Sequence, residues 1–380
     1  MTLDFPLPGC SELKGCLDSI THPTGQGKLT VDLSDLEKKD LVRAGLGLTL
    51  KDFGNALAKA AIRNRRIDRR AIAEVHSEKR TFVRRSGILE VVEPETDLNG
   101  VGGLDMLKTW FRQRRKAFTD RARTFGIEAP KGILLFGVPG CGKSLVAKAC
   151  AASWSFPLLR LDTGALFSSR VGESEANMRS ALRTTEAISP AVLWIDEIEK
   201  ALAGTGSSSY ADAGVTARVF ATLANWLQDR RAPVFVIATA NAVTRLPPEL
   251  LRKGRFDEML FLDLPGENER RAIFRVHLKK RKQDPELFDI DRLAVASDGY
   301  SGAEIEQAVV SALFEAFDQD RLLTTGDIVF SLESQVPISV TMEDQIQALR
   351  AWAAIRARPV SGDRIDEERR RWRKREIRPA

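Results

Sequence analysis

Gly137-Val138-Pro139-Gly140-Cys141-Gly142-Lys143-Ser144 decides the fold, because it matches the pattern G-x-x-x-x-G-K-[ST] between a predicted strand and a predicted helix. The apolar run 132–136 before it is typical of a buried parallel strand, and 145–152 after it has a helical pattern. Glycines let the backbone N–H groups of such a loop approach phosphate oxygens, and the N-terminal end of the following helix favours the same anion. The residues expected at the phosphates are Pro139, Gly140, Cys141, Gly142, Lys143, Ser144 and Leu145. Lys143 would reach the β- and γ-phosphates and the Ser144 hydroxyl would bind Mg²⁺, whereas the alternative is a glycine-rich turn without a ligand.

The composition is that of an ordinary globular protein. The chain has 380 residues, of which 43% are hydrophobic, so it can bury a large core and is long enough for two or three domains. Its net charge is +6, but 52 acidic residues are interspersed with 58 basic ones, which weakens any inference of an anionic partner. The four cysteines form no CxxC pair and the three histidines are scattered, so no zinc site is expected. The sequence shows neither a signal peptide nor a membrane-spanning apolar run, and we expect a cytoplasmic protein.

Short apolar runs alternate with amphipathic stretches in the middle of the chain. The predicted strands are 132–136, 157–161, 192–196, 234–239 and 259–263, and the predicted helices lie near 144–153, 174–188 and 214–229. This alternation is typical of βαβ crossovers. We therefore predict an α/β fold with a five-stranded parallel sheet that is covered on both faces.

Polar side chains follow two of these predicted strands. Asp196 and Glu197 come directly after an apolar run, where carboxylates cost free energy unless they meet a cation. We expect Asp196 to hold Mg²⁺ and Glu197 to take a proton from the attacking water, although an exposed strand end would also explain them. Asn241 follows the next strand, and ligands bind outside the carboxyl ends of parallel strands. Asn241 is thus expected near the γ-phosphate, but an Asn after a strand is also a common turn residue.

Four motifs in this order and spacing resemble the AAA ATPases (ATPases associated with diverse cellular activities) over about residues 98–320. They are the phosphate loop, the strand ending in Asp196-Glu197, Thr239-Ala240-Asn241, and 250–257, which reads Leu-Leu-Arg-Lys-Gly-Arg-Phe-Asp. Further stretches resemble an uncharacterised AAA family encoded in cyanobacterial and algal plastid genomes, namely Gly103-Leu104, Gly140-Cys141-Gly142, 194–198 and 301–307. The resemblance implies a P-loop NTPase core, a C-terminal helical lid, bound ATP and Mg²⁺, and a ring with shared sites, whose isolated monomer would be a poor ATPase.

The resemblance also implies roles for single residues. Arg252 would act in trans as the arginine finger at a neighbour's γ-phosphate, with Arg255 beside it, and such an arginine is worth about 10³–10⁵ in rate. Val101, Gly102 and His277 would lie around the adenine. Gly302 and Ala303 would begin the lid helix beneath the nucleotide, and Ala303 stands where some AAA branches place a sensor arginine.

One departure from the pattern of many AAA proteins concerns the pore. Many protein-unfolding AAA rings carry an aromatic residue just before Val-Gly-Glu-Ser, where this chain has Arg170. An arginine cannot wedge between side chains as an aromatic ring does, although it can bind an acidic chain or a phosphate backbone.

Cys141 lies beside Lys143 at a helix N-terminus, which is expected to lower a thiol pKa and permits oxidative switching. The alternative is that Cys141 is simply a small residue tolerated in the loop.

The predicted organisation has five parts. They are a helical N-terminal domain (1–85), a linker (86–97), the AAA core (98–265), a helical lid (266–355) and a charged tail (356–380). Leu7-Pro8-Gly9 before Glu12 parallels 264–266 before Glu269, and Gly47-Leu48-Thr49 parallels 299–301. We hypothesise that the N-terminal domain is a degenerate copy of the lid, whereas chance similarity over so few positions is the alternative.

Three functions remain open from the sequence. The first is an Mg²⁺-dependent ATPase that forms a homo-oligomeric ring, of six by resemblance, and remodels a macromolecular partner that would be acidic if the basic surfaces hold it. The second is an ATP-switched assembly scaffold with little turnover. The third is a nucleic-acid-stimulated ATPase, for which the arginine-rich runs 63–85 and 108–123 and the tail are weak support, since solvated helix faces explain them as well.

Overall fold

The computed structural model describes residues 8–21, 30–84, 87–93, 96–167, 173–200 and 210–360. The chain forms two compact units. Unit 1 comprises Met1–Val92, Pro157–Leu193 and Ser209–Phe235, and unit 2 comprises Glu93–Phe156, Trp194–Ser208 and Val236–Ala380. The segment around Arg170 and the tail from residue 361 lie outside the described residues.

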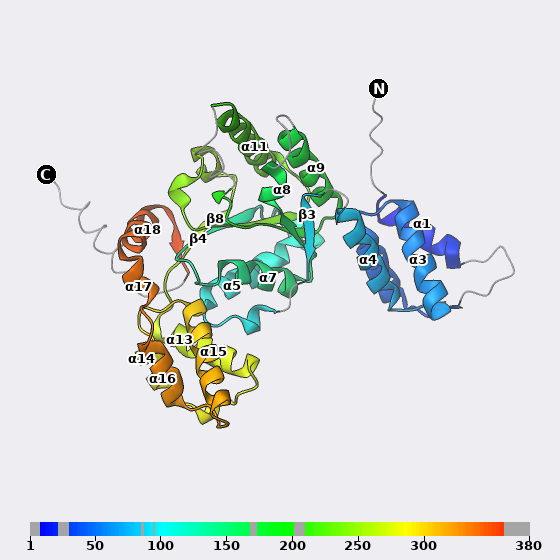
Figure 1. Cartoon of the computed structure of the whole chain (residues 1–380). Coiled ribbons are helices and arrows are strands. Elements are labelled where there is room, and N and C mark those ends of the chain that lie inside the picture. The colour runs from blue at the N-terminus through cyan, green and yellow to red at the C-terminus, as the bar shows by residue number, and fades with distance from the viewer. Residues whose placement is uncertain are drawn as a thin grey trace. The chain divides into compact units, whose positions relative to one another are not determined.

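The N-terminal part of unit 1 is a group of helices with its own apolar core. Its helices are α1 (Cys10–Thr21), α2 (Asp35–Gly45), α3 (Leu50–Asn64) and α4 (Ala71–Arg84), and the strands β1 (Thr30–Val31) and β2 (Arg66–Ile67) form a short parallel pair. α3 begins at Thr49, whose side chain accepts a hydrogen bond from the Asp52 N–H at 3.1 Å. Phe53 and Leu57 are fully buried one turn apart, so one face of α3 packs against α1 and α4. Figure 1 shows these helices in blue.

The remaining elements of unit 1 belong to the α/β core. They are β3 (Leu89–Val92), β5 (Leu158–Leu161), α8 (Thr163–Phe167), α9 (Glu173–Ala187), most of β6 (Ala191–Ile195), α11 (Tyr210–Asp229) and the start of β7 (Val234–Ala240). α9 and α11 lie side by side (Figure 1).

The main sheet has seven strands in the order β3-β5-β6-β7-β4-β8-β9. β4 (Gly132–Gly137) pairs in parallel with β7 on one side and with β8 (Glu258–Leu262) on the other. Every residue of β4 and β7 is buried, which explains why both are continuous apolar runs. The phosphate loop therefore leaves a central strand of the sheet.

The five predicted strands are all present, but the predicted count of five is wrong. The sequence analysis missed β3, which pairs antiparallel with β5, and β9 (Arg358–Pro359), which pairs in parallel with β8. Both are edge strands and both are short. An edge strand needs no continuous apolar run, so charged residues such as Glu90 and Arg358 obscured them.

Short helices and α7 complete the core of unit 2. They are η1 (Leu98–Gly100), α5 (Asp105–Arg115), η2 (Lys116–Phe118), α6 (Asp120–Thr124), α7 (Lys143–Trp154), η3 (Val243–Arg245) and α12 (Pro248–Leu251). Trp154, at the end of α7, donates a hydrogen bond from Nε1 to the Phe111 carbonyl at 3.2 Å and packs edge-on against its ring. This contact fixes α7, and with it the phosphate loop, against α5.

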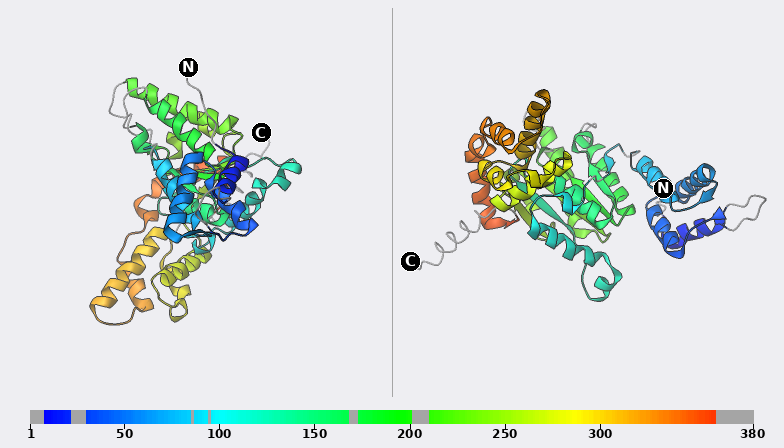
Figure 2. Two further views of the ribbon diagram at one scale, coloured as in Figure 1. Left: turned by 90° about the vertical axis from the view of Figure 1, so that its right-hand side faces the viewer. Right: turned by 90° about the horizontal axis from the view of Figure 1, so that it is seen from below.

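The C-terminal part of unit 2 is a group of helices that contains the predicted lid. It contains α13 (Glu267–Lys280), η4 (Pro285–Leu287), α14 (Ile290–Ala296), α15 (Gly302–Asp318) and α16 (Thr325–Glu333), followed by α17 (Ile338–Thr341) and α18 (Glu343–Arg356). Phe274, Leu293 and Ile305 lie in its buried core. The yellow and orange helices α13–α16 stay together in Figure 1 and in both views of Figure 2. No helix in the described part of the chain has both the length and the apolar character that a membrane crossing requires.

Candidate active site

The phosphate loop is closed over the Lys143 side chain. Its ammonium donates hydrogen bonds to the carbonyls of Gly137 at 3.0 Å and Val138 at 2.9 Å, and the residue is only 7% exposed. Burial lowers the pKa of Lys143, while the nearby carboxylates of Glu199, Glu197 and Asp196 act in the opposite direction. An ammonium has three donors, so one N–H remains for a phosphate oxygen.

Three oxygen-bearing side chains meet where β6 and β7 end. The Ser144 hydroxyl donates to Asp196 Oδ1 at 3.0 Å, and Thr239 Oγ1 donates to the same oxygen at 2.7 Å. Thr239 Oγ1 also accepts from the Glu197 N–H at 2.9 Å and so ties the two strand ends together. The sequence analysis gave Thr239 no role. Its position two residues before Asn241, on the same side of the strand, was the signal that could have found it.

Glu197 is held on both carboxylate oxygens. Asn241 Nδ2 donates to Oε1 at 2.8 Å, and Lys200 Nζ lies 2.5 Å from Oε2. Hydrogen bonding to Glu197 raises the pKa of Lys200. The backbone of Glu197 has a φ of +46°, an unusual conformation for a residue with a side chain that is often found at functional sites.

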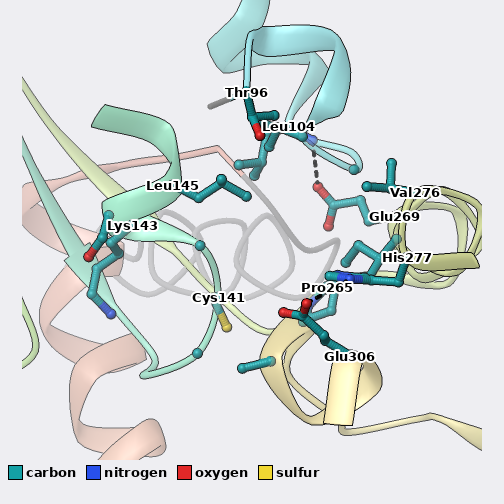
Figure 3. Close-up of a pocket in the computed structure, with 18 of the residues that line it drawn as sticks. Thr96, Leu104, Cys141, Lys143, Leu145, Pro265, Glu269, Val276, His277 and Glu306 are labelled. Atoms are coloured by element: carbon teal, nitrogen blue, oxygen red, sulfur yellow. Dashed lines mark hydrogen bonds and ion pairs between the residues drawn. The ribbon is translucent and has the colours of Figure 1, made fainter. Parts of the chain in front are cut away.

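All the predicted site residues except Arg252 and Arg255 line one cavity of about 700 Å³. The predicted residues that line it are Val101, Gly102, Pro139, Gly140, Cys141, Gly142, Lys143, Ser144, Leu145, Asp196, Glu197, Asn241, His277, Gly302 and Ala303. The cavity also includes residues that the sequence analysis did not name, among them Thr239, Asp263, Glu269, Ile273 and Glu306. Figure 3 shows Leu145 on one side of it and Glu269, Val276 and His277 of α13 on the other.

The lid contributes the far end of this cavity. His277 Nδ1 is buried and has no hydrogen-bond partner among the described residues, and it lies 3.5 Å from Glu306 Oε1. Burial lowers the pKa of His277, against the opposing pull of Glu306, so a neutral imidazole faces the cavity at pH 7. Lys280 Nζ and Arg281 Nη2 hold the same Glu306 oxygen at 3.1 and 3.2 Å.

The lid also bonds directly to the phosphate loop. The Ala303 N–H donates to the Gly140 carbonyl at 3.1 Å, so the first turn of α15 touches the loop. Gly140 has a φ of +77°, and a Cβ there would lie 2.8 Å from Ser301 Oγ. Only glycine adopts this φ and allows this close approach without strain. Because the lid is hydrogen-bonded to the loop, a movement of the lid would change the contacts of the loop.

The expectation that the surroundings of Cys141 lower its pKa is wrong. Desolvation raises the pKa of the Cys141 thiol to about 12, and the opposing effect of Lys143 is smaller. A thiol that stays protonated is a poor nucleophile. The structure therefore favours the alternative reading, in which Cys141 is a small residue tolerated in the loop.

Arg252 and Arg255 lie away from the cavity. Arg252 is exposed at the C-terminal cap of α12, and Arg255 is half-buried. Among the described residues, neither side chain forms a hydrogen bond or an ion pair.

The donor set fits Mg²⁺ bound together with a nucleotide. The described residues contain no group of three or more His, Cys, Asp or Glu side chains that could hold a metal on their own. Mg²⁺ is usually bound by one or two oxygen ligands of the protein plus substrate phosphates, and Ser144 and Asp196 supply such a pair.

Family models match most of the chain in three segments. The model described as "ATPase family associated with various cellular activities (AAA)" matches residues 133–264, and the model "AAA+ lid domain" matches residues 288–328. Residues 11–86 match the model "SpoVK-like AAA ATPase, second domain".

Several named proteins are similar over most of this chain. The "Uncharacterized AAA domain-containing protein ycf46" of Guillardia theta is 44% identical over 353 residues, which are 93% of this chain and 68% of that protein. The protein of the same name in Pyropia yezoensis is 40% identical over 92% of this chain and 70% of its own length. The "ATPase family protein 2 homolog" of Caenorhabditis elegans is 33% identical over 73% of this chain and 39% of its own length.

Proposed function

Since this chain belongs to the AAA ATPase family and is an ATP-hydrolysing enzyme, we propose that the cavity binds ATP with Mg²⁺ at the boundary between subunits of a ring. Hydrolysis there would drive the remodelling of a macromolecular partner. The observation that carries this proposal is the 3.0 Å contact between Ser144 and Asp196 beside the buried Lys143. Oxygen ligands and a cation converge there at the carboxyl ends of parallel strands, where an open α/β sheet binds its ligands.

Each residue at the strand ends would have one task. Lys143 would neutralise the β- and γ-phosphates, and Ser144 and Asp196 would hold Mg²⁺, which when bound offsets phosphate charge. Asn241 would orient the attacking water, and Glu197 would take its proton. Thr239 would act through its neighbours by fixing Asp196 and the backbone of Glu197. Val101, Gly102 and His277 would surround the adenine, as the lid end of the cavity permits.

The ring is proposed because the expected arginine finger does not line the cavity of its own chain. Arg252 and Arg255 do not reach their own cavity and have no partners among the described residues. Arg252 of an adjoining subunit would complete the site as an arginine finger. An isolated subunit is then expected to turn over slowly.

The Glu197→Gln variant tests the proposed hydrolysis. ATP binding should persist, because the loop and Asp196 are intact, and steady-state phosphate release should fall to background. Glu286→Gln, which changes an exposed carboxylate on the lid, should behave like the parent protein. Undiminished turnover in Glu197→Gln would contradict the assigned base.

The ATP-switched scaffold is the second candidate, and one observation favours it. Asn241 and Lys200 each bond to one oxygen of Glu197, so protein donors already engage the proposed base in this state. Turnover by the assembled parent protein separates the two candidates, because a scaffold would bind ATP and assemble with little release of phosphate.

We also propose that the N-terminal helices are a degenerate lid, because the two groups share their local construction. The N–H of Gly9 bonds to Glu12 at 2.8 Å before α1, and the N–H of Gly266 bonds to Glu269 at 3.0 Å before α13. The buried residues of α3 and α15 follow the same spacing, namely Phe53, Ala56, Leu57 and Ala60, and Ile305, Ala308, Val309 and Ala312. An experimental structure in which the two groups do not superpose would remove the proposal.

The partner and the location of the protein remain predictions. Part of the first arginine-rich run is engaged by acidic neighbours, since Arg63 lies 2.5 Å from Glu74 and Arg66 lies 3.2 Å from Asp68. This supports the reading of those arginines as a solvated face and weakens the nucleic-acid alternative. Stimulation of the ATPase by DNA or RNA at low salt would reinstate that alternative. A cytoplasmic location is proposed on the sequence alone.

A further inference from the structure

A second cavity lies beside the nucleotide cavity, and it contains a buried carboxylate oxygen without a partner. Glu199 is 5% exposed; its Oε1 accepts from the Asn241 N–H at 2.7 Å, while its Oε2 has no hydrogen-bond partner among the described residues. Glu199 lines a cavity of about 220 Å³, here called the Glu199 cavity. An unpaired buried carboxylate costs free energy, so the site favours a ligand that supplies a donor.

We propose that the Glu199 cavity receives one guanidinium group from a second copy of the chain, and that Arg255 of that copy supplies it. This inference rests on the proposed ring. The cavity has the size for a single side chain rather than a nucleotide. Met342, Ile346 and Leu349 form an apolar wall that suits the methylene stem of an arginine. Arginine stays charged when buried, whereas lysine tends to lose its proton.

Cations of the same chain do not fill this role. Lys200 also lines the cavity, but its ammonium lies 2.5 Å from Glu197 Oε2. Arg245 is exposed at the cavity and makes no hydrogen bond or ion pair in the described part of the chain, yet Glu199 Oε2 stays unpaired. A cation from another molecule can therefore pair with Glu199 Oε2.

Arg255 is the candidate because two adjacent acceptor sites call for two arginines that lie close together in the chain. The nucleotide cavity and the Glu199 cavity share Pro139 and Asn241, so the proposed γ-phosphate position and Glu199 are neighbours. Arg252 and Arg255 are three residues apart in the chain, and the Arg255 side chain makes no hydrogen bond or ion pair among the described residues. One docking event would place Arg252 at the phosphate and Arg255 at Glu199.

The pairing would connect the subunit boundary to the catalytic base. Glu199 Oε1 holds the backbone of Asn241, and the Asn241 side chain holds Glu197. A guanidinium on Glu199 Oε2 would fix the first of these contacts. Glu199 is therefore a positioning residue: when a neighbouring subunit binds to it, the position of Asn241 is fixed, and with it the position of Glu197.

A double-mutant cycle on ATP-dependent self-association tests the pairing. The full chain is studied in the Glu197→Gln background with saturating ATP, and the dissociation constant is measured by sedimentation velocity. Arg255→Ala should weaken association on the order of 30-fold or more, because it leaves a buried charge unpaired. In the Glu199→Gln background the same change should cost less than about threefold, since the partner is already gone. Arg245→Ala is the matched control and should have the same effect in both backgrounds.

The following outcomes of the double-mutant cycle would overturn the pairing of Arg255 with Glu199. Equal weakening by Arg255→Ala in both backgrounds would overturn the pairing and leave the ring intact. A parent protein that stays monomeric in ATP would overturn the pairing and the proposed ring together. If thermal melting shows that Glu199→Gln does not fold, Leu349→Arg repeats the test by placing a cation of the same chain in the cavity. Arg255→Ala should then add little to that variant, and a full additional loss would reject the pairing.

Discussion

At the scale of single residues, the buried Lys143 ammonium makes ATP binding depend on pH. Burial lowers the pKa of Lys143, and bound phosphates would raise it again. At any pH at which Lys143 of the free protein is neutral, ATP binding is then accompanied by the uptake of one proton. The affinity for ATP should be constant below the lowered pKa and should fall as the pH rises through it, by up to about tenfold per pH unit. Calorimetric titration from pH 7.5 upward measures this.

The control for this prediction is Lys143→Arg, whose guanidinium stays charged over the whole range. Its affinity, although different from the parent's, should not change with pH. A fall of equal steepness in both proteins would show that another group titrates.

Thr239 gives the second prediction at this scale. Thr239→Val keeps the shape of a side chain that is 1% exposed but removes the donor to Asp196 and the acceptor for the Glu197 N–H. We expect kcat to fall by roughly 10- to 100-fold, as for other residues that orient metal ligands. Thr81→Val, at an exposed threonine of α4, should leave kcat unchanged. Parental turnover by Thr239→Val would show that Thr239 is only a packing residue.

Some predicted residues line the cavity because local geometry sets their positions, whereas others were expected there only from the family resemblance, namely Val101, Gly102, His277, Gly302 and Ala303. Lys143 and Ser144 follow a glycine loop, and Asp196 and Asn241 follow apolar runs, so the chain around each one fixes its direction. Glu269 and Glu306 were missed because they reach the cavity only when the lid folds back on the core. Nothing in a helix face alone distinguishes such residues from ordinary surface carboxylates.

At the scale of elements, two glycines end comparable turns before α3 and α15. Gly47 has a φ of +87° and Gly299 a φ of +82°, a region that other residues adopt only with strain. Replacing either with alanine should lower the free energy of unfolding by about 1 kcal/mol or more. Gly15→Ala is the control, because this glycine lies within α1 with open space around it, and it should stabilise by roughly 0.5–1 kcal/mol. Urea unfolding measures all three, and a neutral Gly47→Ala would count against the shared construction.

The attachment of α18 to β8 gives another prediction. Arg350 Nε lies 2.9 Å from Asp263 Oδ2 and Nη2 lies 2.9 Å from Oδ1, and both residues are buried. Arg350→Met should cost about 3–5 kcal/mol of stability, because the buried Asp263 carboxylate loses the guanidinium that balances its charge. Adding Asp263→Asn should recover part of that loss, and thermal unfolding measures it. A double variant that is no more stable than Arg350→Met would contradict this account.

The central strands of the sheet could be predicted from the sequence, whereas two edge strands could not. The central strands were predictable because burial on both faces requires continuous apolar residues, as in β4 and β7. The edge strands β3 and β9 carry no such requirement, and their pairing depends on partners far away in the sequence. Periodicity within a window of residues cannot detect them.

At the scale of the whole molecule, one chain supplies the proposed site except for the arginine that a neighbour would provide in the proposed ring. The loop, the strand ends and the lid all belong to unit 2, whereas Arg252 lies outside the cavity that it would serve. A shared site explains why an isolated subunit should be a slow enzyme. The central claim is therefore that each site uses Lys143 of one subunit and Arg252 of another.

Mixing two inactive variants tests this claim most directly. Lys143→Ala removes the phosphate contact and Arg252→Ala removes the finger, so each protein alone should release phosphate at background rate. In a 1:1 mixture, Arg252→Ala sites next to Lys143→Ala subunits regain both groups, and random assembly predicts roughly a quarter of the parent's ATPase rate. A mixture no faster than its components, or an Arg252→Ala protein as active as the parent, would contradict the account.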